Sequence, residues 1–196
     1  MSDLYTNLTD LHDMARTLID DVEVLRPHLG STAIEIEKTP EEKANRRFFV
    51  RAVFALVEAV VEQHKRLLLE LQRTGRVSME QCDVAVLSEK IYYAKDNGAV
   101  QQRDQYLSLK SKLRAVYRIA GEAFGRPLSV DFGGTGWPSF GKSIAIRDRI
   151  THPKTMDECR VSSENLETVE EGHSWFRGLQ NEYVRVAREH RSESGW

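Results

Sequence analysis

The stretch FFVRAVFALVEAVVEQHKRLLLEL, residues 48–71, decides the fold class of this chain. On a helical wheel of about 100° per residue its charged side chains fall within one arc of about 140°, and the rest of the perimeter is mostly apolar. A helix of this kind packs against neighbours on most sides, which is typical of the centre of a helical bundle. The charges also exclude a membrane-spanning helix, so no membrane partner is expected. They are Arg51, Glu58, Glu62, Lys65, Arg66 and Glu70.

Helical periodicity recurs on both sides of this stretch. Apolar residues follow helical spacing from Leu4 to Leu25, and a last helix is expected from about 162 to 190. The segments between are predicted to be a short helix over roughly 80–96, a turn at 96–98, a helix whose core face runs from Tyr106 to Phe124, and a helix from about 138 to 152. We therefore predict one all-α domain over 1–196, a bundle of about five to six helices with a glycine-rich, flexible loop at 128–138.

The charge composition limits the kinds of partner. The chain has 196 residues, with 28 Lys and Arg against 30 Asp and Glu, which excludes a strongly basic nucleic-acid coat protein and an acidic disordered tail. Residues 46–76 nevertheless carry 7 basic and 3 acidic side chains, and residues 101–126 carry 6 and 2. A solvated helix face and an RNA-contacting face explain these surpluses equally well.

The two cysteines and the N-terminal residues bear on location. Cys82 and Cys159 are far apart and neither has a CxxC partner, so neither a disulfide framework nor a zinc site is indicated. The first ten residues lack the basic and apolar regions of a secretion signal. A cytoplasmic location is therefore expected.

Residues 136–143, GWPSFGKS, fit the Walker A pattern G-x-x-x-x-G-K-S. That motif binds phosphate only when a strand of a parallel sheet precedes the loop and a helix follows it. Only residues 128–132 could form such a strand, and no second buried strand is predicted. Nucleotide binding at this motif is therefore the weaker alternative.

Residues 144–153, IAIRDRITHP, are more informative. At about 100° per residue Arg147 falls among the apolar positions of its helix, whereas Arg149 points the opposite way and is expected in solvent. A guanidinium among apolar neighbours needs a partner or a function, either an ion pair, for instance with Glu58, or a place in a binding site. Pro153 frees His152 from helical register, so its ring can turn toward the same face.

This segment resembles the motif of the HEPN superfamily of all-α domains, in which Arg is followed by a polar residue and, after a short spacer, by His. Arg147, Asp148 and His152 match that pattern in order and type. The long helix over 47–65 and the last helix are also similar to the helices that flank the motif in this group. A second Arg–His pair, Arg185 and His190, has valine in place of the polar residue.

The resemblance implies a metal-independent endoribonuclease that needs no cofactor and leaves 2′,3′-cyclic phosphate ends. His152 would transfer the proton, and Arg147 would hold the non-bridging phosphate oxygens. Asp148 would orient one of these two side chains. It also implies single-stranded RNA as substrate and a homodimer with two motifs around one cleft. The candidates for steering RNA are Arg46, Arg47, Arg51, Lys110, Arg114 and Lys154.

Two biological settings fit this interpretation. The nuclease could be a toxin or a phage-defence effector with a cognate antitoxin protein as partner. The alternative is a HEPN-like dimeric binding module without catalysis.

Overall fold

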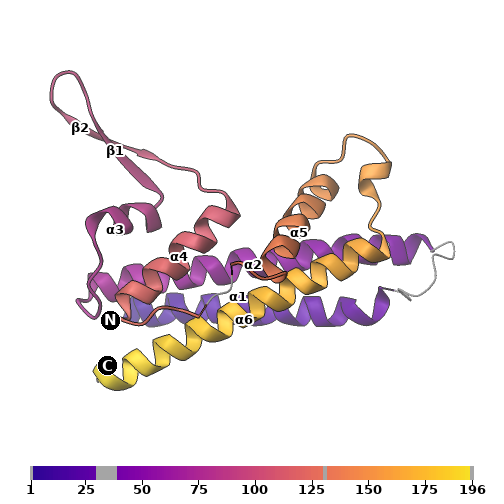
Figure 1. Ribbon diagram of the computed structural model, residues 1–196, viewed down its shortest axis with the longest axis horizontal. Coiled ribbons are helices and arrows are strands. Elements are labelled where there is room, and N and C mark those ends of the chain that lie inside the picture. Colours follow the sequence, from indigo (N-terminus) through magenta and orange to yellow (C-terminus); the bar gives the residue numbers. More distant parts are fainter. Residues whose placement is uncertain (1, 30–38, 130–131, 195–196) are drawn as a thin grey trace. The chain divides into compact units, whose positions relative to one another are not determined.

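The computed structural model describes residues 2–29, 39–129 and 132–194, with side chains from residue 13 onward. Six α-helices dominate these residues, so the predicted all-α class is confirmed. No helix in these ranges is both long enough and apolar enough to cross a membrane. The elements are α1 (Ser2–Leu25), α2 (Pro40–Arg73), α3 (Gln81–Leu87), β1 (Lys90–Ala94), β2 (Val100–Asp104), α4 (Leu109–Ala123), α5 (Gly136–Thr151) and α6 (Ser163–Ser194), with 3-10 turns η1 (Arg26–His28) and η2 (Asp157–Cys159) (Figure 1).

The described residues form two compact units. The first unit contains residues 2–8, 61–129 and 181–194, and the second contains residues 9–29, 39–60 and 132–180. The motif of α5 belongs to the second unit.

The core of the first unit contains a stack of buried rings. His64 of α2 lies parallel to Tyr183 of α6 with 3.7 Å between ring centroids, and its Nδ1 is 3.0 Å from the Tyr117 hydroxyl of α4. The Tyr183 hydroxyl donates to the His64 carbonyl at 3.3 Å. Burial lowers the pKa of His64 to about 3, so this ring is a neutral packing element at neutral pH.

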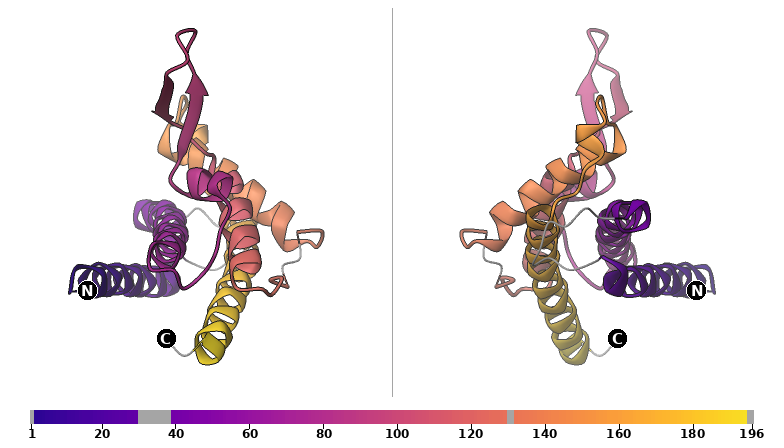
Figure 2. Two further views of the ribbon diagram at one scale, coloured as in Figure 1. Left: turned by 90° about the vertical axis from the view of Figure 1, so that its left-hand side faces the viewer. Right: turned by 90° about the vertical axis from the view of Figure 1, so that its right-hand side faces the viewer.

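A β-hairpin replaces part of the predicted helices of the first unit. Residues 80–96 were expected to be helical, but α3 ends at Leu87 and β1 pairs antiparallel with β2 (Figures 1 and 2). The strand residues Ile91, Tyr92 and Tyr93 favour extended backbone, and Gly98 takes the left-handed conformation of a hairpin turn, with φ of 80°. Tyr106 was placed on a helical core face, yet it precedes α4 and is 90% exposed.

In the second unit α5 packs closely on α6. Phe140 and Ser143 of α5 lie against Gly172 of α6, where a Cβ would come within 2.8 Å of the Phe140 Cα. The side chains around this contact form an aromatic cluster of Phe132, Trp137, Phe140, Trp175 and Phe176. This contact anchors the N-terminal half of α5, and its last turn carries the motif.

The loop predicted at 128–138 ends earlier than expected, because α5 begins at Gly136 rather than near residue 138. Residues 130 and 131 of that loop lie outside the described residues.

Candidate functional site

The motif lies in the last turn of α5 and the residue that follows it. The helix ends at Thr151, as Pro153 predicts, and the backbone N–H of His152 still donates to the Asp148 carbonyl at 3.0 Å. His152 has φ of −127° and ψ of 57°, outside the helical region, and its side chain is exposed. An imidazole so placed is accessible to a ligand.

Arg147 is half-buried between α5 and α2, with 25% of its side chain exposed. Its Nη2 lies 3.0 Å from Glu58 Oε1, and its guanidinium carbon lies 5.2 Å from the centre of the Phe54 ring. A cation above an aromatic face is attracted to the ring and loses little by partial burial. The structure therefore contains the ion pair with Glu58 that the sequence left open as an alternative.

Asp148 is the second carboxylate beside Arg147. Its Oδ1 lies 3.3 Å from Arg147 Nε, but Nε is buried and makes no hydrogen bond, so the contact is electrostatic. The side chains of Glu58 and Asp148 are 52% and 59% exposed. Both carboxylates thus face solvent while the guanidinium lies beneath them.

Arg147 and His152 are five residues apart, which corresponds to about 7.5 Å along a helix axis. A phosphate group approaching Arg147 passes the two carboxylates that flank it, Glu58 and Asp148. The two carboxylates oppose such an approach, because they repel an anion.

Three of the proposed RNA-contacting residues lie in this same unit and are accessible. Arg51 Nη2 donates to the Ile150 carbonyl at 2.7 Å, which satisfies a terminal acceptor of α5. Arg47, on the same helix, is half-buried, and Lys154 is exposed three residues beyond the end of α5. Arg51 therefore stabilises the end of α5 and also places a positive charge beside the motif.

Arg46 is a correction to the sequence prediction. It is 1% exposed, its Nε donates to the Leu29 carbonyl at 2.9 Å, and its Nη1 donates to the Val161 carbonyl at 3.2 Å. A guanidinium held inside by backbone acceptors cannot reach an RNA phosphate. Arg46 instead ties the end of α1 and the start of α6 to α2.

Lys110 and Arg114 are exposed on α4, in the first unit. Their neighbour along the basic ridge, Arg118, forms ion pairs with Asp83 and Glu122 at 2.6 and 2.7 Å. Part of the basic surplus of this helix is therefore neutralised by acidic neighbours.

The Walker A match is a helix, not a phosphate-binding loop. Residues 136–143 form the first two turns of α5, and in the described ranges strands occur only in the β1–β2 hairpin. The motif residues have packing roles instead. A Cβ on Gly136 would lie 2.6 Å from Trp175, and the Ser143 hydroxyl donates to the carbonyls of Ser139 and Thr168.

Arg149 is the second correction. It was expected in solvent, but its Nη1 donates to the Glu158 carbonyl at 2.8 Å and its Nη2 to Asn165 Oδ1 at 3.0 Å. These bonds fasten η2 and the start of α6 to the end of α5. Phe54 was not among the predicted site residues, although its position four residues before Glu58 places both on one helix face.

The site contains no obvious metal centre. In the ranges that the structure describes, His, Cys, Asp and Glu side chains nowhere gather in threes to hold a metal ion.

Comparison with family models, with curated proteins and with solved structures gave no match to this chain.

Proposed function

We propose that the chain is a HEPN-like, metal-independent endoribonuclease whose active site is formed by Arg147, Asp148 and His152. The observation that supports it best is that a half-buried guanidinium lies in the last turns of α5 and an exposed imidazole directly follows that helix. The 2′-hydroxyl of RNA attacks the adjacent phosphate while His152 accepts its proton, the bond from phosphorus to the 5′-oxygen of the next nucleotide breaks, and that oxygen takes a proton back from the imidazolium. His152 is the proton-transfer group, and the product ends are a 2′,3′-cyclic phosphate and a 5′-hydroxyl.

Arg147 stabilises charge that grows on the phosphate during this attack. A planar guanidinium binds two phosphate oxygens at once, which an ammonium cannot do in the same way. Asp148 positions the guanidinium from the side, and the surface that guides single-stranded RNA includes Arg47, Arg51 and Lys154. Lys110 and Arg114 add positive charge on α4 and have a smaller part.

The test is cleavage of single-stranded RNA in the presence of EDTA, with product ends identified by mass spectrometry. His152→Ala is expected to abolish cleavage. His28→Ala is the matched control, because His28 is also exposed in the second unit but lies outside the motif, and this variant should cleave at the wild-type rate. Intact RNA with wild-type protein at high concentration, or equal cleavage by both variants, would refute the proposal.

A second candidate function rests on the ion pair between Arg147 and Glu58. In a HEPN-like binding module without catalysis, this pair would only fix α5 on α2. Glu58→Gln separates the two candidates. In the nuclease it removes an anion that competes with phosphate, so RNA binding should tighten by about two- to fivefold, the worth of a half-exposed pair.

The control for that variant is Glu62→Gln, which breaks ion pairs of the same helix with Lys65 and Arg66. It should leave RNA affinity unchanged to within twofold. If Glu58→Gln lowers stability without changing RNA affinity, the non-catalytic module is favoured.

The proposal includes a homodimer and a toxin or defence setting with a cognate antitoxin protein. Sedimentation velocity measures the first, and expression of the wild type against His152→Ala in a bacterial host measures the second. Growth arrest by the wild type alone supports a toxin.

A further inference from the structure

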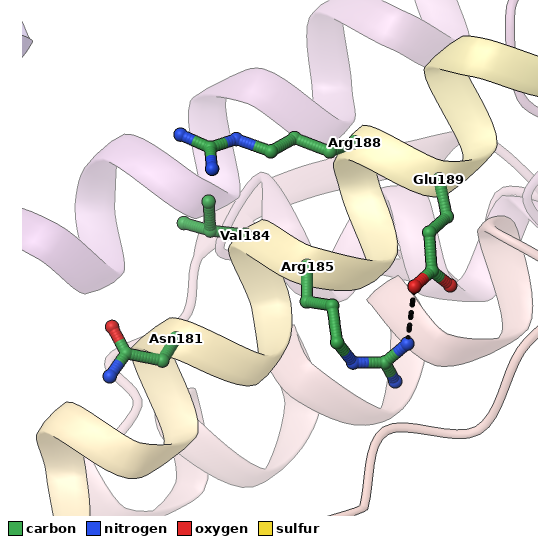
Figure 3. Close-up of a pocket in the computed structure, with 5 residues that line it drawn as sticks. All are labelled: Asn181, Val184, Arg185, Arg188 and Glu189. Atoms are coloured by element: carbon green, nitrogen blue, oxygen red, sulfur yellow. Dashed lines mark hydrogen bonds and ion pairs between the residues drawn. The ribbon is translucent and has the colours of Figure 1, made fainter.

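Two hollows outside the motif are lined mainly by polar side chains. One, of about 490 Å³, is bordered by five residues of α6 in the first unit (Figure 3). Two of its three charged side chains, Arg185 and Glu189, point toward each other and form an ion pair of 2.7 Å, and the third, Arg188, extends away from them. A groove on one helix, with two charges paired and the third directed away, gives no reason to expect a ligand.

The other hollow is a cavity of about 340 Å³ in the second unit, between the end of α1 with η1 and one face of α6. Its volume is suited to a small ligand. The lining residues are all polar: Glu23, Arg26, Glu170, His173, Ser174 and Arg177.

The acidic side of this cavity is partly neutralised. Arg26 Nη1 lies 2.6 Å from Glu170 Oε1, and Arg26 Nε lies 3.4 Å from Glu23 Oε2. The same guanidinium rests over the Phe49 ring at 5.6 Å, which holds it in place. Arg26 therefore contacts both carboxylates but balances only one of their two charges.

The side formed by α6 presents the donors of His173, Ser174 and Arg177, and its one carboxylate, Glu170, is paired with Arg26. His173 is 5% exposed, and its Nε2 is buried without a hydrogen-bond partner among the described residues. Ser174 and Arg177 lie beside it, one residue and one turn further along the helix. A buried polar nitrogen without a partner is destabilising, and a ligand atom that bonded to it would remove that cost.

At His173 itself the charges of Arg177 and Arg26 outweigh that of Glu23. Burial, with Arg177 and Arg26 nearby, lowers the pKa of His173 to about 4, although Glu23 acts in the opposite direction. The ring is therefore neutral at neutral pH and offers one N–H donor. Arg177 is the cation of this cavity that Glu23 and Glu170 do not pair with, so a bound cation would be repelled there.

We infer that this cavity binds a small oxyanion, a carboxylate or phosphate group, between Arg177, Ser174 and His173. Arg177 supplies the charge and a planar pair of donors, and the Ser174 hydroxyl supplies a third donor. His173 lines the cavity beside them, so its ring signals report on occupancy. This site is separate from the motif of α5, and its occupancy does not depend on ribonuclease activity.

The test is an NMR titration of the full chain with inorganic phosphate and, separately, with acetate, following the imidazole signals of His173. We expect a saturable shift with at least one of the two ions, and the ion that binds more tightly identifies the chemical class. Arg177→Gln should weaken binding at least tenfold. Arg188→Gln is the matched control, an exposed arginine of the same helix outside this cavity, and should leave the affinity unchanged.

Three results would overturn the inference. They are no saturable shift at millimolar ion, an equal affinity in Arg177→Gln and the wild type, and an equal loss in both arginine variants, which would indicate net charge alone. Ser174→Ala adds an independent measure, because this exposed position tolerates alanine and should still weaken binding severalfold.

Discussion

The contact between α5 and α6 predicts opposite effects for one substitution at two glycines of the same helix. A Cβ at Gly172 would lie 2.8 Å from the Phe140 Cα and 2.9 Å from the Ser143 Oγ, whereas a Cβ at Gly178 would meet no atom within 4 Å. Alanine gains about 1 kcal/mol over glycine in a helix interior. Overpacking against a backbone atom costs about 1–3 kcal/mol or more, because α5 itself must move.

Gly178→Ala should therefore raise the free energy of unfolding by up to about 1 kcal/mol, and Gly172→Ala should lower it by up to about 2 kcal/mol. Urea unfolding followed by circular dichroism measures both changes. The melting temperature should rise for Gly178→Ala and fall for Gly172→Ala, by about 2–4 °C per kcal/mol. Gly172→Ala should also change tryptophan fluorescence, since Trp137 and Trp175 lie in this cluster. Stabilisation by both variants would refute the close packing of α5 on α6.

Three further predictions follow from buried or misassigned groups. Arg46→Met leaves the Leu29 and Val161 carbonyls without their donor and should lower the free energy of unfolding by about 3 kcal/mol, measured in urea; an effect below 1 kcal/mol would contradict it. The pKa of His64 is about 3 in the folded protein against 6.5 for a free histidine, so the unfolded chain takes up the proton first. Stability should therefore fall as pH drops from about 6.5 toward 3, by up to about 1.4 kcal/mol per unit, and His64→Gln should flatten this slope in unfolding curves. Lys142 is exposed on a helix, so the protein should bind no Mg-ATP in calorimetry and Lys142→Ala should change its stability by less than about 0.5 kcal/mol.

The helices of this chain could be predicted because their apolar spacing extends over many turns. The ends of α5 and α2 also carry local signals, Pro153 after the one and Pro40 at the start of the other. The hairpin could not be predicted in the same way. Its strands are five residues each, and in so short a run the apolar and polar residues fit a helix face as well as a strand.

The burial of Arg46 could have been predicted from its position around the helix, as for Arg147. At about 100° per residue, with Phe48 at zero, Arg46 falls near 160°, between Val53 near 140° and Val57 near 180°. Counting it as a charge of the basic stretch hid its position on the apolar face. The partners of Arg46 could not have been predicted, because Leu29 and Val161 come from distant parts of the chain and offer backbone atoms that no sequence pattern marks.

The ion pair between Arg147 and Glu58 is too weak to close the proposed active site. A pair whose side chains are 25% and 52% exposed is worth about 0–1 kcal/mol, whereas each charge-assisted hydrogen bond from a guanidinium to phosphate contributes about 1.5–3 kcal/mol. A phosphate held by two such bonds therefore displaces Glu58 at small cost. The effect of Glu58→Gln on RNA affinity must then stay within a few fold. A gain above tenfold, about 1.4 kcal/mol, would exceed what this pair supplies and would require Glu58 to repel RNA over a wider surface than Arg147 alone.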